Sequence, residues 1–193
     1  MIQRERGRNC LPPLPQDLET MDIPQEMKAL TDGMPFLQFD SGPGADRILI
    51  FSTHDSLAVL VNSDQWFADG AFRVEPPIFH QLYTIHGIHL GFNVPLVYTL
   101  LPNKTQRTYT RLLQELKNLS PGIQPQSVLT DYEMAAIKRF EAEFPNVKMI
   151  GCYYHLTQSV WRQVQCLGLT QNFAKICQML PCLAFLLQRM VIE

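Results

Sequence analysis

The sequence predicts an α/β fold with a mixed sheet, because its hydrophobic pattern changes part-way along the chain. Three strand-like runs follow one another at residues 67–74, 81–90 and 94–101, and the connections between them contain Pro or Gly. Such short connections favour antiparallel pairing. From about residue 105 onward, amphipathic helices alternate with short buried strands. Three antiparallel strands followed by alternating α and β units predict a mixed sheet, and we expect helices on both of its faces.

The first long helix is expected between a threonine cap, Thr105 or Thr108, and the stop signal Pro121-Gly122. Between these limits the apolar residues recur at helical spacing, which predicts one buried face. The other expected elements are, in chain order, a strand at 48–51, a helix at 56–61, a strand at 127–130, a helix over 134–144, a strand at 147–154 and a helix over 160–167.

Composition excludes several classes of protein. A chain of 193 residues with 46% hydrophobic residues is long enough for one domain with a real core and too apolar to be wholly disordered. Its five cysteines are an odd number without a C-x-x-C pair, which argues against a disulfide scaffold and favours a reducing compartment. We find neither the apolar run of a signal peptide nor a run of about 20 apolar residues. We therefore expect a protein that is neither secreted nor inserted in a membrane.

The N-terminal part of the chain differs from the rest. Residues 1–46 hold six of the fourteen prolines, and residues 1–66 carry five Lys or Arg against ten Asp or Glu. Residues 67–193 carry eleven Lys or Arg against eight Asp or Glu, so only this part is mildly basic. We expect 1–46 to be a poorly ordered, acidic lead segment with little core of its own, and 47–193 to be the folded domain.

Two aspartates lie at positions of the predicted sheet where α/β folds commonly bind ligands. Asp69 interrupts the apolar run 66–72, and Asp131 follows the strand at 127–130. In open α/β sheets, ligands bind beyond the carboxyl ends of strands where the strand order switches. If the fourth strand pairs with the first, the two carboxylates face each other, and a divalent cation would relieve their repulsion. Hard oxygen ligands favour Mg²⁺ or Mn²⁺, which serve phosphoryl transfer.

Both aspartates also have ordinary structural explanations. Asp69-Gly70 is a strong hairpin dipeptide, so the two residues could form a turn instead of lying within a strand. Asp131 could cap the helix that follows it. Spacing alone leaves these alternatives open.

Five segments extend the pattern around the two aspartates. They lie, in a characteristic order and spacing, at residues 66–72, 77–86, 94–104, 129–133 and 151–156. Together they resemble the transposase domain of Mutator-like elements (MULE), a branch of the DDE transposases with a ribonuclease H-like fold. The resemblance spans about residues 47–165, and the predicted strand order is the one that this fold requires.

The resemblance implies roles for individual residues. Asp69 and Asp131 correspond to the first two acids of the catalytic triad and would bind Mg²⁺ or Mn²⁺. The third acid, a glutamate, is expected after a helical insertion further downstream. Glu141 and Glu143 come too early in the order, and Glu193 is the last residue of the chain. The family motif is thus two thirds present, and we expect the domain to be truncated at its C-terminus.

Cys152 and His155 match the C-x-x-H signature of the family. A structural zinc ion normally takes four protein ligands, and this pair supplies two, so zinc is not expected. A packed thiol and a hydrogen-bonded imidazole near the active site is the favoured interpretation. His155 is a candidate for orienting a substrate phosphate or for proton transfer.

The resemblance further implies cleavage and transfer of DNA strands at transposon ends, with double-stranded DNA as the partner. It also implies nuclear residence, and we consider a homo-oligomer. Lys104, Arg107 and Arg111 cluster at the start of a predicted helix, where they are either a solvated helix face or phosphate contacts. With two of three acids, the chain resembles a fragment or a domesticated relic. The alternative is a catalytically inactive remnant that binds nucleic acid or a protein, so whether the chain is an active enzyme stays open at this point.

Overall fold

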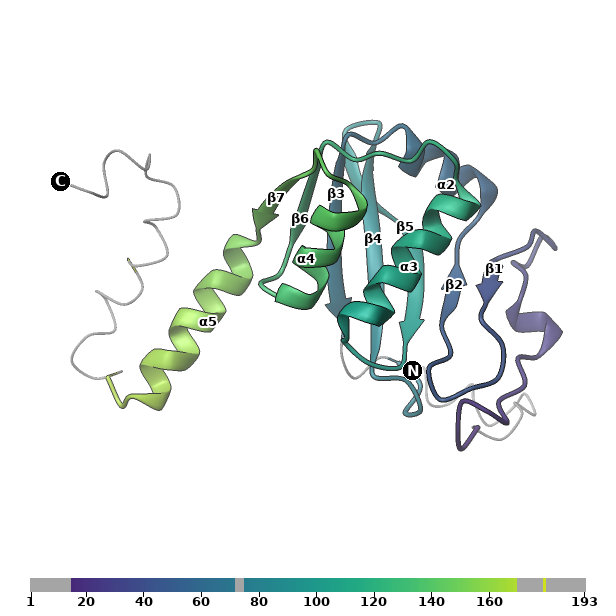
Figure 1. Cartoon of the computed structure of the whole chain (residues 1–193), viewed down its shortest axis with the longest axis horizontal. Coiled ribbons are helices and arrows are strands. Elements are labelled where there is room, and N and C mark those ends of the chain that lie inside the picture. The colour runs from purple at the N-terminus through teal and green to yellow at the C-terminus, as the bar shows by residue number, and fades with distance from the viewer. Residues whose placement is uncertain (1–14, 72–74, 170–178, 180–193) are drawn as a thin grey trace.

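A seven-stranded sheet forms the centre of the molecule in a computed structural model, which describes residues 15–71, 75–169 and 179 (Figure 1). The sheet has the order β1-β2-β5-β4-β3-β6-β7. Its strands are β1 (Leu37–Asp40), β2 (Leu49–Phe51), β3 (Gln65–Ala71), β4 (Gln81–His89), β5 (Phe92–Leu101), β6 (Ser127–Thr130) and β7 (Lys148–Gly151). The helices are the 3₁₀ turn η1 (Gln25–Met27) and the α-helices α2 (His54–Val61), α3 (Gln106–Leu119), α4 (Met134–Glu143) and α5 (Tyr153–Cys166).

The pairing of the strands confirms the predicted mixed sheet. Strands β3, β4 and β5 form an antiparallel meander, and β2 and β1 extend it antiparallel beyond β5. On the other side β6 pairs parallel with β3, and β7 pairs parallel with β6. The strand expected at 67–74 starts two residues earlier, at Gln65, and residues 72–74 lie outside the described part of the chain.

Helices α2, α3 and α4 cover one face of this sheet. Helix α3 begins at the predicted cap, because the Thr105 side chain accepts a hydrogen bond from the backbone N–H of Thr108. Its apolar residues recur at helical spacing and are fully buried: Tyr109, Leu112, Leu113 and Leu116. They join residues of α2, α4 and the sheet in one hydrophobic core. In the described ranges, no helix is both long and apolar enough for a bilayer.

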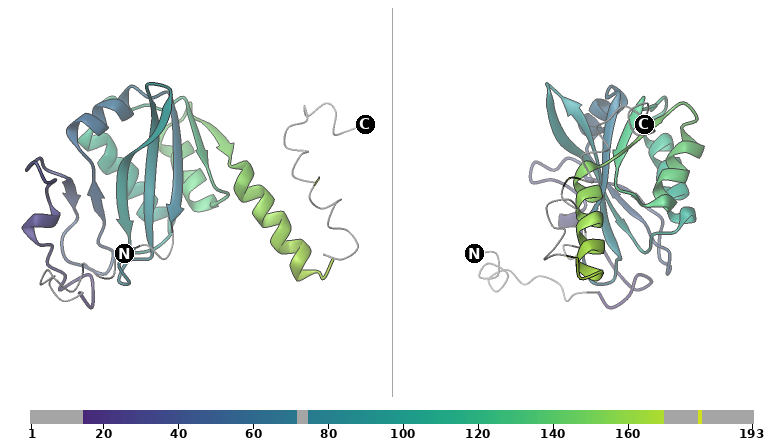
Figure 2. Two further views of the ribbon diagram at one scale, coloured as in Figure 1. Left: turned by 180° about the vertical axis from the view of Figure 1, so that it is seen from behind. Right: turned by 90° about the vertical axis from the view of Figure 1, so that its left-hand side faces the viewer.

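The second face differs from the expectation of helices on both faces. Seen from behind, strands β3, β4 and β5 lie in front of the helices, with no helix across them (Figure 2). Helix α5 begins beside β7 and extends away from the sheet instead of packing over it (Figures 1 and 2). Amphipathic spacing predicts that a helix buries one side, but it does not say which face of the sheet receives it. Within the described residues, the expectation is therefore wrong for this face.

The expectation of a poorly ordered lead segment is also wrong for residues 15–46. Strand β1 adds to the edge of the sheet, and Leu18 and Ile23 form a second buried cluster with Leu49 and Phe79. The Arg47 guanidinium donates to the backbone oxygens of Leu18 and Met21 and so fastens this segment. The proline-rich composition of this segment gave no sign of a core, because its apolar residues are few. These residues become buried only through their contact with the sheet. Residues 1–14 lie outside the described part.

Candidate active site

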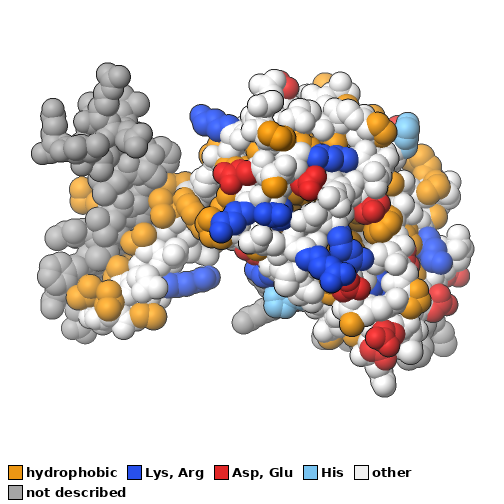
Figure 3. Space-filling model, in the orientation of Figure 1, with side chains coloured by type: hydrophobic (Ala, Val, Ile, Leu, Met, Phe, Trp, Pro, Cys, Tyr) orange, Lys and Arg blue, Asp and Glu red, His pale blue; other side chains and the backbone are white. Residues whose placement is uncertain are grey.

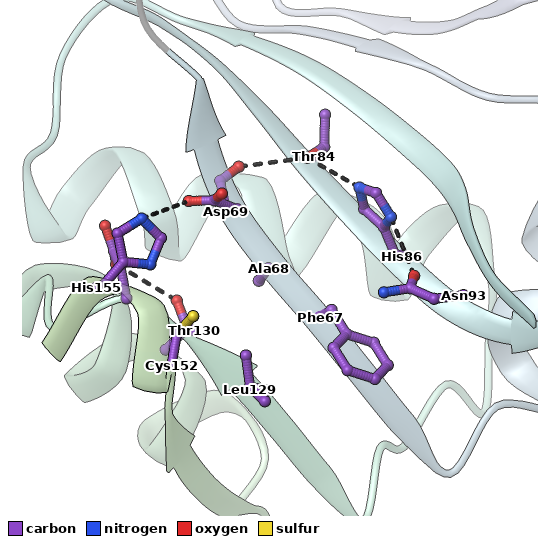
Figure 4. Close-up of a pocket in the computed structure, with 11 residues that line it drawn as sticks. Phe67, Ala68, Asp69, Thr84, His86, Asn93, Leu129, Thr130, Cys152 and His155 are labelled. Atoms are coloured by element: carbon purple, nitrogen blue, oxygen red, sulfur yellow. Dashed lines mark hydrogen bonds and ion pairs between the residues drawn. The ribbon is translucent and has the colours of Figure 1, made fainter. Parts of the chain in front are cut away.

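A hollow of about 200 Å³ opens on the second face of the sheet, near the ends of β3 and β6 (Figure 4). Strands β3, β4 and β6, the start of β5 and the beginning of α5 contribute its walls. The lining residues are Phe67, Ala68, Asp69, Thr84, His86, Asn93, Leu129, Thr130, Asp131, Cys152 and His155. It therefore brings together both aspartates and the C-x-x-H pair that sequence reasoning selected.

Asp69 reaches this hollow because of the alternation along β3. Trp66 and Ala68 are buried in the helix-covered core, so Phe67 and Asp69 face the other side. The Asp69 side chain is 56% exposed. Strand β3 continues through Asp69-Gly70 and pairs there with β4, Asp69 opposite Thr84. The hairpin-turn alternative for Asp69 is thereby excluded.

Asp131 follows β6 directly. Because β6 pairs parallel with β3, with Thr130 opposite Ala68, the two aspartates come next on neighbouring strands. The Asp131 carboxylate accepts a hydrogen bond of 3.1 Å from the backbone N–H of Glu133, which fixes its position. The N-cap of α4 is Glu133, so Asp131 does not occupy the cap position that the structural alternative required.

Cys152 and His155 stand at the start of α5. The backbone N–H of Cys152 donates to the carbonyl of Thr130, which joins α5 to the end of β6. One turn later, Nε2 of His155 lies 3.8 Å from Oδ1 of Asp69 (Figure 4). The other ring nitrogen, Nδ1, is buried and has no hydrogen-bond partner among the described residues. The imidazole is therefore aimed at Asp69 and retains one unused hydrogen-bonding atom.

The comparison with protein families fits this geometry. The model of the MULE transposase domain matches residues 65–159, a range that contains every residue lining the hollow. Residues 65–159 form a MULE transposase domain. The resemblance predicted from sequence is thus confirmed. No curated protein matches the chain. The family implies a transposase-related function, DNA as the partner and use of a divalent metal ion.

The donor set of the MULE domain fits such an ion. Two carboxylates on neighbouring strand ends supply hard oxygen ligands, and Mg²⁺ is commonly held by one or two carboxylates together with several waters. Across the described ranges, no three His, Cys, Asp or Glu side chains come together as a metal site. Cys10, Cys177, Cys182 and Glu193 lie outside those ranges.

Sequence reasoning missed a polar row along β4 of the MULE domain. The His86 ring lies 3.3 Å from the Thr84 hydroxyl oxygen and 3.1 Å from the Asn93 amide oxygen, and all three residues line the hollow. Thr84 and His86 share a strand face, and β4 is the neighbour of β3. That alternation is the signal that could have placed them beside Asp69.

Glu133 is a second residue that sequence reasoning missed. Its carboxylate accepts a hydrogen bond of 2.8 Å from the Tyr109 hydroxyl and forms an ion pair of 2.8 Å with Lys104. The Tyr109 hydroxyl in turn accepts a hydrogen bond of 2.7 Å from Gln81. Burial raises the pKa of Tyr109 far above its ordinary value, so the hydroxyl stays a donor. This buried network ends at the residue whose N–H holds Asp131.

The three residues expected to contact DNA, Lys104, Arg107 and Arg111, do not lie together in the structure. Lys104 lines a second hollow, of about 460 Å³, together with Asp131 and His155. Arg111 pairs with Asp46 at 3.0 Å, and Arg107 lies 3.7 Å from the same carboxylate. Both arginines are on α3, which covers the opposite face, where basic and acidic side chains lie side by side (Figure 3). Only Lys104 is therefore placed near the carboxylates.

The acids considered on α4 lie away from the hollow. Glu143 ends α4 and pairs with Lys117 of α3 at 2.9 Å. Glu141 is on the same helix, on the helix-covered side of the sheet. Neither residue lines the candidate site.

Proposed function

We propose that the MULE domain catalyses metal-dependent cleavage and transfer of DNA strands. The observation that carries the proposal is the position of Asp69 and Asp131 in one hollow, at the ends of two parallel neighbouring strands. Two carboxylates so placed repel each other unless a cation or a proton lies between them. The hollow is open to solvent through Asp69, so an extended substrate can reach it.

In this proposal Asp69 and Asp131 would hold Mg²⁺ or Mn²⁺, and the ion would offset developing negative charge on a phosphoryl group. The chain positions both ligands: β3 fixes Asp69, and the Glu133 N–H fixes Asp131. His155 orients a phosphate oxygen or accepts the proton of the attacking hydroxyl. In the in-line displacement, the attacking oxygen bonds to phosphorus while the opposite P–O bond breaks.

The partner in this proposal is double-stranded DNA at the ends of a transposon. Work on chromosomal DNA would place the protein in the nucleus. Strand transfer joins two DNA segments, and a homo-oligomer of the domain would hold both of them.

Titration with Mn²⁺, followed by electron paramagnetic resonance of the free ion, tests the carboxylate pair. We expect Asp69→Asn to weaken Mn²⁺ binding at least roughly tenfold and the double variant Asp69→Asn, Asp131→Asn to abolish it, because each change removes a charged ligand. Asp55→Asn is the matched control, since this exposed acid lies on α2. Tight binding that persists in the double variant would sink the proposal.

A second candidate function is a catalytically inactive remnant that binds nucleic acid or a protein. It is favoured by one observation: in the described part of the chain, no third acid joins Asp69 and Asp131 in a metal-binding group. It predicts DNA binding that weakens steeply with salt, without any nicking in Mg²⁺ or Mn²⁺. Filter binding and a plasmid-nicking assay on the same preparation separate the two candidates. If the protein binds no DNA even at low salt, only the remnant that binds a protein partner is left as a candidate.

A further inference from the structure

Tyr132 presents a supported aromatic ring beside the candidate metal ligand Asp131. Tyr132 lies in the connection between β6 and α4, and the residue is 49% exposed. A Cβ atom added to Gly151 would lie 2.5 Å from the Tyr132 hydroxyl oxygen and 2.7 Å from Cζ. The phenol therefore rests directly on the backbone of β7, and glycine is required for this close approach. One side of the Tyr132 side chain thus contacts β7, and the other side is exposed to solvent.

The open side belongs to the second hollow, which Asp131 and His155 share with the first one. Tyr132, Ser159 and Arg162 line it, together with Lys104 and Glu133. Lys104 and Glu133 form an ion pair, so their charges offset each other. Arg162 has no ion-pair partner among the described residues and adds a positive charge to the wall. An aromatic platform, a hydroxyl and a guanidinium thus surround the space next to Asp131.

We propose that the second hollow binds one unpaired nucleotide of the DNA strand, with its base stacked on Tyr132 and its phosphate held by Arg162 and Ser159. A base inside a duplex is covered on both sides by its neighbours, so only an unpaired or extruded base can stack on this ring. Arginine forms forked hydrogen bonds with phosphate, and the serine hydroxyl can donate a further one. The inference rests on the proposed function, since DNA as the ligand comes from it.

Fluorescence anisotropy with labelled DNA in Ca²⁺ tests this subsite. The probes are a blunt duplex and the same duplex with a single-stranded tail that carries 2-aminopurine. We expect the wild-type protein to prefer the tailed duplex and to quench the 2-aminopurine fluorescence by stacking. Tyr132→Ala should weaken tailed binding roughly tenfold and abolish the quenching, with blunt binding unchanged, since stacking acts on an unpaired base. Tyr132→Phe keeps the ring and should stay within about twofold of wild type.

Two further variants separate the subsite from general stability. Gly151→Ala displaces the ring without changing its chemistry and should reduce tailed binding as Tyr132→Ala does. Arg162→Gln should lower the slope of log affinity against log salt by about 0.7 on tailed DNA. The controls are Phe92→Ala, which removes an exposed ring at the start of β5, and Arg107→Gln, which removes an exposed cation of α3. Thermal melting of each variant confirms folding.

Equal affinity of Tyr132→Ala and wild type for tailed DNA would overturn the inference. Equal weakening on tailed and blunt DNA would also overturn it. If the wild-type protein binds both probes equally, the proposed nucleotide subsite is rejected. Metal binding by Asp69 and Asp131 is then still tested independently by the Mn²⁺ titration. If it binds neither probe, the DNA partner of the proposed function fails together with the subsite.

Discussion

Glu133 connects the buried core of the domain to the candidate metal ligand Asp131. Its backbone N–H holds Asp131, and its side chain is held by Tyr109 and Lys104. A carboxylate with 16% side-chain exposure is tolerated because both oxygens have strong donors. Tyr109 is fully buried, and its hydroxyl is shared between Gln81 and Glu133. The position of the site residue thus depends on a hydroxyl in the core.

Tyr109→Phe should lower the free energy of unfolding by about 1–3 kcal/mol, because Gln81 and Glu133 each lose the hydrogen bond that they share with the Tyr109 hydroxyl. Urea unfolding followed by circular dichroism measures this change. Tyr154→Phe is the control, since its hydroxyl contacts Gln158 on the exposed side of α5, and we expect it to change stability by less than about 0.5 kcal/mol. Equal effects of both variants would contradict the role given to the buried network.

His155→Ala should slow metal-dependent nicking by about 10²–10⁴-fold, the usual contribution of a group that transfers a proton. The motivating observation is the imidazole placed 3.8 Å from Asp69. Single-turnover nicking of a plasmid at several pH values measures the effect. An unchanged nicking rate would remove His155 from the catalytic residues and leave it a packing role.

At the scale of elements, one arginine joins the N-terminal segment to the sheet. Arg47 is 5% exposed; it donates to the Asp40 carboxylate at 2.8 and 2.6 Å and to two backbone oxygens of residues 18–21. The Arg47 side chain lowers the pKa of Asp40 below its ordinary value, mainly through these hydrogen bonds. Strand β1 and the segment before it are thus held to β2 by one buried cation.

Asp40→Asn should lower the free energy of unfolding by about 1.5–3 kcal/mol near neutral pH, because it removes the charge that balances Arg47. Since the folded-state pKa lies below 3.8, the wild-type advantage is present above that pH and disappears as the pH falls through the folded value. Urea unfolding of both proteins between about pH 3 and pH 7 measures this dependence. The control is Asp46→Asn, whose 55% exposed carboxylate should contribute less than about 1 kcal/mol.

At the scale of the whole molecule, the two faces of the sheet have different covers. Helices α2, α3 and α4 cover one face and form the main hydrophobic core with it. On the other, residues 15–36 cover β2 and β5, while the ends of β3 and β6 remain open as the candidate site. The segment expected to be a disordered leader thus completes the core next to the open site.

A chain that begins at residue 47 should be less stable than the full chain, because it exposes Leu49, Phe79 and Leu100 and loses β1. We expect a lower midpoint of thermal unfolding and binding of the dye ANS to the uncovered apolar surface. Circular dichroism melting and ANS fluorescence of both chains measure these changes. If the 47–193 chain is monomeric and has the same midpoint of thermal unfolding as the full chain, the domain boundary expected between residues 46 and 47 would be supported instead.

Hydrophobic spacing determined the order and type of the elements from β3 to α5, because helix and strand periods are local properties. It also drew attention to Asp69 and Asp131 at the predicted strands, whereas Cys152 and His155 were selected by the resemblance to the MULE family. Only the tertiary structure decided which face each helix covers, since an apolar stripe does not specify its partner. The parallel pairing of β6 with β3 likewise placed the two aspartates in one hollow and excluded the hairpin turn. Glu133 and Tyr132 gained their positions through residues 24 and 19 places away, distances over which sequence periodicity carries no information.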